Sequence, residues 1–205
     1  MANSSEISKT ELVEYINFSS KSVQQNCHQK EPLYNCLTVD IDIEKMNMDD
    51  AYHLFVKDEA VDIPFAVWLL ENPDSPISFP GSIYLNSHDY IHLMLNRGMS
   101  LFDEAFVVGY TMGNCDAINN HYIQLYKLAS TCLYPKKYKF RSKHMLAFDI
   151  GFMYGQKIPT KNIHLFNFCE FKSKSIKEVR SYLGISIFEV RHLWKAEQVL
   201  VSSSD

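Results

Sequence analysis

Apolar residues recur at three- and four-residue spacing along much of the chain, which is the pattern of helices that bury one face. Strand signals, in contrast, are few. We therefore expect an all-α fold. The pattern, together with its capping and breaking residues, predicts helices over residues 9–23, 83–96, 100–112, 121–132, 142–156 and 175–183.

The turn between the second and third predicted helices is short. Gly98 stands where a left-handed C-terminal cap belongs, and Ser100 is a good N-cap with Asp103 three residues later. Helices joined by so short a turn are expected to form an antiparallel hairpin. Further along, Ser175 and Glu178 form the sequence pattern of a capping box.

The length of 205 residues predicts a single domain with a sizeable apolar core. The 46% hydrophobic and 21% charged content excludes a disordered chain, and the low glycine and proline content argues against β-sandwiches and propellers. Within residues 1–205 we distinguish an N-terminal part (1–79), a core (80–185) and a loose tail (202–205). Clear breaks fall at residues 72–76 and 80–82.

Charge is distributed unevenly along the chain. Residues 1–104 hold 17 acidic and 6 basic side chains, whereas residues 105–205 hold 7 and 14. The net charge of −4 does not indicate the overall basic character of a nucleic-acid-binding protein. The densest basic stretch can bind phosphate or an anionic membrane surface, or can be an ordinary solvated segment. It consists of Lys136, Lys137, Lys139, Arg141 and Lys143.

Cysteine usage and the termini bear on localisation. The five cysteines are odd in number and contain no C-x-x-C pair, so we expect reduced thiols. The first residues show no signal-peptide pattern, and no stretch of 18 apolar residues is present. The expected location is cytoplasmic, with peripheral attachment to the cytoplasmic side of a membrane as a further prediction.

The strongest chemical pattern is a group of two histidines and two carboxylates. His88 and His92 are four residues apart and share a helix face, with Asp89 next to them. His92 lies six residues before Gly98 and Glu104 six after it, so an antiparallel hairpin places the two level with each other. Nitrogen and oxygen ligands of this kind suit a divalent metal ion, although helix caps and chance spacing also produce such patterns.

Other metal patterns fit less well. A calcium loop beginning at Asp40 lacks the required glycine and final glutamate. H-E-x-x-H peptidases need glutamate where Asp89 stands. His88 and Asp89 are adjacent, unlike the H-x-D pair of 2-His-1-carboxylate iron sites, and the outer histidine and aspartate of HD-type phosphohydrolases cannot be placed.

The motif His88-Asp89-Tyr90-Ile91-His92, followed by eleven residues and Glu104, resembles the signature of the Coq4 family of ubiquinone-biosynthesis proteins. The resemblance covers residues 80–185. It includes Gly98, two glycines four apart in residues 147–155, and the segment 175–183. Residues 1–79 match weakly and the aromatic-acidic stretch is reduced to residues 166–170, which indicates a divergent, bacterial-type member.

The resemblance implies a mainly helical, membrane-peripheral protein in which His88, Asp89, His92 and Glu104 hold a divalent ion. Zinc is the first expectation, with magnesium, iron, manganese and cobalt as alternatives. The implied activity is decarboxylation of a polyprenylated hydroxybenzoate, with one carboxylate of the motif as the alternative proton donor. A non-catalytic prenyl-lipid-binding scaffold and a metal-dependent phosphate-ester hydrolase are the alternative functions. Expected partners are an isoprenoid lipid, an anionic membrane, other quinone-biosynthesis proteins and a second copy of the chain in a homodimer.

A prenyl chain requires a long apolar groove. Gly151 and Gly155 can allow close approach of a ligand or, alternatively, of another helix, and apolar residues nearby can line a groove or simply form the core. The candidate lipid-binding residues are Gly151, Gly155, Phe148, Phe152, Met153, Tyr110 and Met112.

Overall fold

The fold is all-α, as the sequence predicts. The computed structural model describes residues 43–55 and 63–202, and all of them lie within one compact unit. In these ranges the chain forms eight α-helices and three short 3-10 helices but no strand, and Asn47 and Ser175 form one isolated bridge. The predicted helix over residues 9–23 lies outside the described residues, and the single-domain organisation of residues 1–205 remains a prediction.

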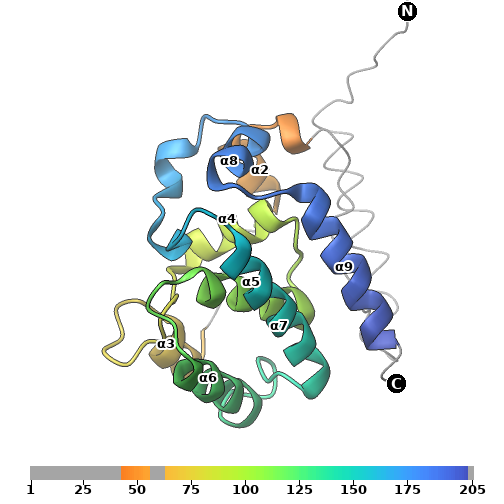
Figure 1. Ribbon diagram of the computed structural model, residues 1–205. Coiled ribbons are helices and arrows are strands. Elements are labelled where there is room, and N and C mark those ends of the chain that lie inside the picture. Colours follow the sequence, from red (N-terminus) through yellow and green to blue (C-terminus); the bar gives the residue numbers. More distant parts are fainter. Residues whose placement is uncertain (1–42, 56–62, 203–205) are drawn as a thin grey trace, which may run out of the picture. The chain divides into compact units, whose positions relative to one another are not determined.

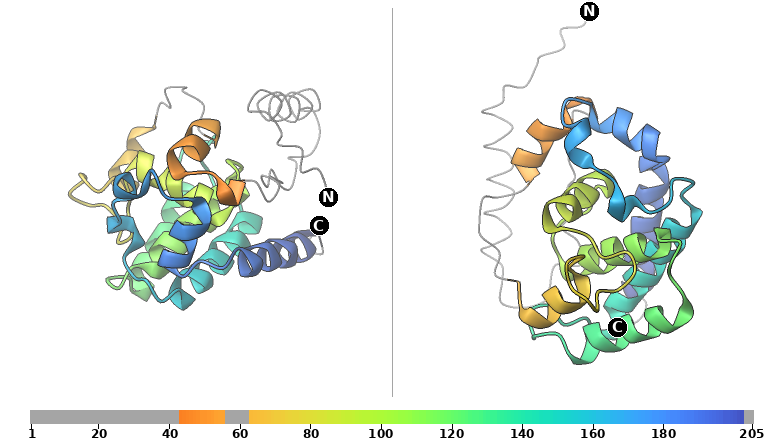
Figure 2. Two further views of the ribbon diagram at one scale, coloured as in Figure 1. Left: turned by 90° about the horizontal axis from the view of Figure 1, so that it is seen from above. Right: turned by 90° about the vertical axis from the view of Figure 1, so that its left-hand side faces the viewer.

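The helices are arranged as shown in Figures 1 and 2. Their bounds are η1 Ile43–Lys45, α2 Met48–Phe55, α3 Phe65–Glu71, α4 Leu85–Leu95, α5 Leu101–Asn114, α6 Asn120–Cys132, α7 Ser142–Lys157, η2 Ile163–Leu165, η3 Phe168–Phe171, α8 Ile176–Leu183 and α9 Ile187–Ser202. The five predicted helices from α4 to α8 are confirmed within two residues at each end. The predictions omitted α2, α3 and α9.

Helix α5 forms the centre of the core. Every residue from Phe102 to Asn114 is buried except Glu104, so the helix is enclosed on almost all sides. Helices of this kind contribute most of their stability through tertiary packing rather than intrinsic propensity. Glu104 is therefore the one position after the first residue of α5 at which the helix reaches an open surface.

Helices α5 and α7 pack backbone to backbone. A β-carbon on Gly109 or Gly113 would overlap the backbone of Phe148 or Phe152, and one on Gly151 would overlap Phe106. Gly109 faces Phe148, and four residues later Gly113 faces Phe152. Residue numbers therefore increase in the same direction along both helices, which are parallel. Small residues at four-residue spacing permit this approach, and larger side chains would separate the helices.

The turn between α4 and α5 differs from its prediction at one position. The left-handed residue is Asn96, with φ 50°, and not Gly98. Asparagine adopts this conformation more readily than other non-glycine residues, which explains why it serves as the cap. The predicted start of α5 is confirmed, because Ser100 and Asp103 form a reciprocal capping box.

Helix α8 secures the C-terminal end of α4. The buried Arg180 donates hydrogen bonds from Nε to the carbonyl of Met94 (2.8 Å) and from an Nη atom to that of Leu93 (3.0 Å). These carbonyls belong to the last turn of α4, beyond which the regular helical donors end. The carbonyl of Leu93 also accepts a hydrogen bond from the backbone N–H of Asn96 at 3.3 Å. Burial lowers the pKa of Arg180 to about 10, so the guanidinium stays charged at neutral pH. The segment 175–183 thus holds α4 in place.

Candidate metal centre

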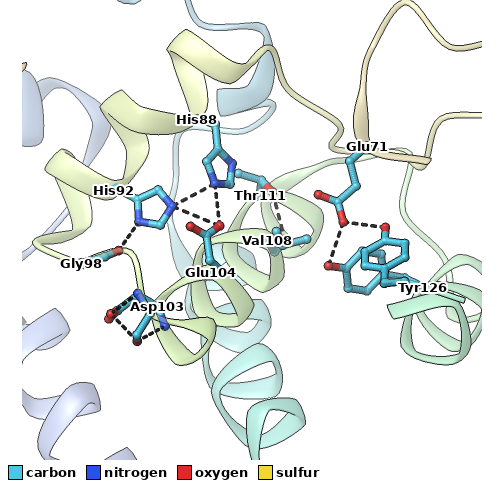
Figure 3. Close-up of polar contacts among 11 residues, drawn as sticks. Glu71, His88, His92, Gly98, Asp103, Glu104, Val108, Thr111 and Tyr126 are labelled. Atoms are coloured by element: carbon cyan, nitrogen blue, oxygen red, sulfur yellow. Dashed lines mark hydrogen bonds and ion pairs between the residues drawn. The ribbon is translucent and has the colours of Figure 1, made fainter. Parts of the chain in front are cut away.

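Three side chains from α4 and α5 converge across the turn that joins these helices (Figure 3). His88 Nε2 lies 2.9 Å from His92 Nε2 and 3.1 Å from Glu104 Oε2, and His92 Nε2 lies 3.5 Å from Glu104 Oε2. The meeting of these three residues, which their spacing predicts, is confirmed. The antiparallel hairpin as such remains a prediction.

The triangle of donor atoms fits a tetrahedral metal ion. Ligand atoms about 2.0–2.1 Å from zinc are separated by about 3.4 Å. The three observed separations differ from that value by about 0.5 Å or less. These atoms can therefore occupy three corners of a tetrahedron after small side-chain adjustments. The fourth corner is open to another protein ligand, water or substrate.

Burial of the three residues leaves one accessible side. The His92 side chain is fully buried, whereas 15% of His88 and 31% of Glu104 are exposed. A small molecule can thus approach the triangle past His88 and Glu104. This accessibility distinguishes the cluster from a purely structural group sealed in the core.

The backbone fixes the tautomer of His92. Its Nδ1 lies 2.7 Å from the carbonyl oxygen of Gly98 and donates its proton to it. In the neutral imidazole the lone pair is then on Nε2, the atom that faces His88 and Glu104. Metal-binding histidines commonly have an outer partner of this kind, which orients the ring and increases its basicity. Gly98 therefore matters through its carbonyl, and not as a left-handed cap.

The electrostatic surroundings favour the charged forms of His88 and Glu104. Burial disfavours the imidazolium of His88, but the Glu104 hydrogen bond and the charges of Glu104, Asp89 and Glu71 outweigh it and raise the pKa of His88. For Glu104, burial alone would raise the pKa, and the two histidines reverse this and lower it well below its ordinary value. The ionised carboxylate of Glu104 thus attracts the protonated forms of the two histidines, and a divalent ion can take the place of their protons.

Asp89, the fourth predicted ligand, does not join the three-residue group. Its Oδ2 accepts a hydrogen bond from the Tyr52 hydroxyl on α2 at 3.4 Å. Burial raises the pKa of Asp89, while the nearby His88 and His92 lower it in part. Direct or water-mediated ligation by Asp89 remains a prediction.

Glu71, the last residue of α3, is a further carboxylate near the triangle that the sequence analysis did not identify (Figure 3). Its Oε1 accepts hydrogen bonds from the hydroxyls of Tyr126 (3.2 Å) and Tyr134 (2.6 Å). Burial raises the pKa of Glu71, although both tyrosines and His88 lower it in part. The only signal in the sequence is a lone acid directly after six apolar residues.

The candidate lipid-binding residues are mainly packed in the interior. Gly151 and Gly155 face the backbone of α5, which agrees with the helix-packing alternative. Tyr110, Met112 and Phe148 are buried core residues, and Met153 is 68% exposed. Phe152 is half-buried and stacks on Phe148. Lipid binding by this set of residues remains a prediction.

The basic stretch lies in the connection between α6 and α7 and at the start of α7. Lys136, Lys137, Lys139 and Arg141 are exposed, whereas Lys143 is half-buried with its ammonium 5.4 Å from the centroid of the Phe102 ring. The stretch therefore presents four cations to solvent. Its binding to phosphate or an anionic membrane remains a prediction.

Two of the localisation expectations can be checked in part. None of the helices in the described ranges has the length and hydrophobicity of a membrane-spanning segment. Cys115, Cys132 and Cys169 are free thiols, as expected from the absence of paired motifs. Cys27 and Cys36 lie outside the described residues.

Comparison of the chain with protein-family models, curated proteins and solved structures finds no match in any of the three.

Proposed function

We propose that the protein is a Coq4-like, metal-dependent lyase that removes the ring carboxylate from a prenylated hydroxybenzoate. The observation that carries the proposal is the triangle of His88 Nε2, His92 Nε2 and Glu104 Oε2, with separations of 2.9–3.5 Å. The motif spacing supplies the link to Coq4 chemistry. Zinc is the proposed ion, because two imidazoles and one carboxylate with an open fourth position form a familiar catalytic zinc site.

In this proposal His88, His92 and Glu104 hold the ion, and Asp89 supports it through a water molecule. A bound divalent ion stabilises negative charge on a carboxylate or phenol oxygen as the carbon–carbon bond breaks. His92 keeps its Nε2 lone pair directed inward because its Nδ1 proton is engaged by the Gly98 carbonyl. The exposed edges of His88 and Glu104 mark the side from which the aromatic acid enters.

Attachment to a membrane would give access to a prenylated substrate. Helix α6 carries exposed apolar side chains that include Tyr122, Leu125 and Leu128, and Leu133 follows at its end. Three-residue spacing places the first three on one side of the helix. Because the exposed basic stretch follows directly, we propose that α6 and this stretch rest together on an anionic bilayer on the cytoplasmic side.

The test combines metal analysis with a carboxyl-labelled substrate. Protein purified without added metal is analysed for its elements, stripped with a chelator and reloaded with single divalent ions. We expect about one ion per chain and release of labelled carbon dioxide from a prenylated hydroxybenzoate that depends on the ion. Bound isoprenoid without carbon dioxide release would favour the scaffold alternative. Release of phosphate from an ester substrate would instead favour the hydrolase.

A further inference from the structure

We propose that Glu71 is the acid–base residue of this site: it carries a proton on Oε2, facing the metal-binding triangle, and delivers it to the substrate. The inference rests on the decarboxylation proposed above and adds a residue outside the H-D-x-x-H…E motif. Two parts of the chain that are far apart in the sequence build this arrangement. One is α3 with Glu71, and the other is α6 with Tyr126 together with the chain just beyond α6, which carries Tyr134.

The hydrogen bonds determine which carboxyl oxygen can hold the proton. The hydroxyls of Tyr126 and Tyr134 both donate to Oε1 of Glu71, at 3.2 and 2.6 Å. A carboxyl oxygen has two acceptor positions, so Oε1 is fully used. A proton on Glu71 must therefore reside on Oε2. Figure 3 shows this second oxygen turned toward the side of His88 and Glu104.

The two tyrosines are well suited to hold the carboxyl in one orientation. Tyr126 is completely buried and Tyr134 is 5% exposed, so neither hydroxyl exchanges freely with bulk water. Tyr126 is further fixed by stacking on Phe148, with ring centroids 5.2 Å apart. Burial and the neighbouring Glu71 raise the pKa of both tyrosines, which keeps them neutral donors at physiological pH. They act as positioning residues and do not reach the substrate themselves.

The surrounding groups set the charge preference of Glu71. The titratable groups that act on it are Tyr126 and Tyr134 on one side, and His88 of α4 and Glu104 of α5 on the other. Desolvation of the half-buried carboxyl is the largest influence and favours the protonated form of Glu71, and in the metal-free protein the charge of Glu104 adds to it. Glu104, in contrast, is kept ionised by two histidines. Two carboxyl groups in one site with opposite protonation preferences are typical of an acid and a ligand or base with separate roles.

The proton balances the reaction. When the bond between the ring and the carboxylate carbon breaks, its electron pair remains on the ring carbon and carbon dioxide leaves. The ring carbon then takes the proton from Glu71 Oε2 and forms a carbon–hydrogen bond. Glu71 becomes a carboxylate, held by the hydroxyls of Tyr126 and Tyr134, and regains a proton from water. No oxidant or reductant is needed.

The experiment compares the parent with Glu71→Gln in the full-length, zinc-loaded protein, with the exposed Glu170→Gln as a matched control. We expect Glu71→Gln to retain its zinc and its helical circular dichroism but to lose about 100-fold or more of its carbon dioxide release, as removal of an acid–base group does. The Glu170→Gln variant should keep the parent rate. Unchanged release by Glu71→Gln would overturn the proposal.

Infrared spectroscopy provides a readout that does not depend on turnover. At pH 7 the parent should show the carbonyl stretch of a protonated carboxyl that is absent from Glu71→Gln and present in Glu170→Gln. If the parent releases no carbon dioxide, the proposed lyase function is wrong, and this band alone decides whether Glu71 holds a proton. Absence of the band overturns the assignment of the proton to Glu71.

A second variant keeps the carboxyl and tests its positioning. In Tyr134→Phe one acceptor position of Oε1 becomes free, so the proton can occupy either oxygen. We expect slower carbon dioxide release at unchanged zinc content, together with a displaced pH profile. A rate and pH profile identical to those of the parent would overturn the argument from the two hydroxyls.

Discussion

Arg97 in the turn between α4 and α5 donates a 2.8 Å hydrogen bond to Glu197 of α9, 100 residues further along the chain. Both side chains are fully buried, and Asp103 lies 3.6 Å from the other end of the guanidinium. The guanidinium carbon also lies 3.7 Å from the centre of the Phe106 ring. The C-terminal helix thereby fixes the turn on which the metal-binding triangle depends.

Breaking this buried pair should be costly. In Glu197→Gln the guanidinium of Arg97 loses its closer carboxylate partner and keeps only Asp103 at 3.6 Å, and we expect unfolding by urea to show a loss of up to about 3–5 kcal/mol. Replacing both residues by methionine should cost less than the sum of the single changes, because neither member of the pair is then left without the other, although Asp103 still loses its cation.

The surface pair of Lys157 and Glu189 serves as the control for that measurement. Its side chains are 64% and 37% exposed, so Glu189→Gln should change the unfolding free energy by less than about 1 kcal/mol. Equal losses for Glu197→Gln and Glu189→Gln would contradict the structural role assigned to Arg97.

Close packing of α5 on α7 leads to a second stability prediction. In Gly151→Val the new side chain would overlap the carbonyl group of Phe106, which belongs to the backbone and cannot rotate away. We expect a loss of at least about 1–3 kcal/mol, or failure to fold, on the scale of other overpacked cores. Gln156→Val on the same helix is the control, since Gln156 is exposed to solvent. It should unfold at nearly the parent temperature.

The metal-binding triangle should behave as one unit. Glu104→Gln keeps the shape of the side chain but removes its charge, and His88→Ala removes a ligand. Each should strongly reduce zinc content, and the double variant should lose little more, because members of one site are not additive. Zinc titration followed by calorimetry measures this. If Glu104→Gln bound zinc with the affinity of the parent, Glu104 would not be a zinc ligand. It would then be only a negative charge near the N-terminus of α5, which stabilises the helix by about 0.3–1 kcal/mol.

The pH dependence differs between the metal-free and the zinc-bound protein. The pKa of His88 is raised in the fold, so the bond between its protonated ring and Glu104 stabilises the metal-free protein below the ordinary histidine pKa of about 6.5. This stabilisation is lost as pH rises through the folded pKa. Because Glu104 has a lowered pKa, its own contribution is present above about pH 4.3 and declines as pH falls further.

Zinc binding should show the opposite trend. A histidine must be neutral to bind the ion, so zinc affinity should fall with decreasing pH, with a midpoint above about 6.5 because the pKa of His88 is raised. Thermal unfolding of both forms between pH 5 and 8 tests this. Zinc affinity that stays constant over that range would exclude His88 and His92 as ligands.

Local sequence patterns predicted those features that neighbouring residues determine. The Ser100–Asp103 and Ser175–Glu178 capping boxes need only residues three apart, and both are present. The convergence of His88 with Glu104 follows from helical spacing on either side of a short turn. Each of these relationships involves one helix or two consecutive helices, so the residues that determine it lie close together in the sequence.

Features that depend on distant parts of the chain were not predicted. Glu71 reaches the site only because α3 packs beside Tyr126 and Tyr134, which follow it by 55 and 63 residues. Helix α9 contains the buried Glu197, whose charge suggests an exposed position until its partner Arg97 is known. The left-handed cap was assigned to Gly98 on residue preference, although Asn96 ends the helix two residues earlier.

The last prediction concerns the proposed membrane surface, formed by α6 and the basic stretch. Leu125 and Leu128 are 53% and 58% exposed, and together with the exposed Tyr122 and Leu133 they form a group of apolar side chains of the kind found at contact surfaces. Each lysine near an anionic bilayer contributes about 1 kcal/mol, so Lys136→Glu combined with Lys137→Glu should weaken binding to phosphatidylserine vesicles at least about tenfold. Leu125→Glu should weaken it as well, because burying a charge among acyl chains is costly.

The exposed valine of α9, Val199, provides the matched control for this experiment, because it is 69% exposed on another helix. Val199→Glu should leave vesicle binding unchanged if α6 and the basic stretch form the contact. Cosedimentation at rising salt separates the two contributions: the lysine-dependent part should weaken as ions screen the surface, and the leucine-dependent part should remain. Equal effects of Leu125→Glu and Val199→Glu, or binding to neutral and anionic vesicles alike, would contradict an anionic membrane contact through α6.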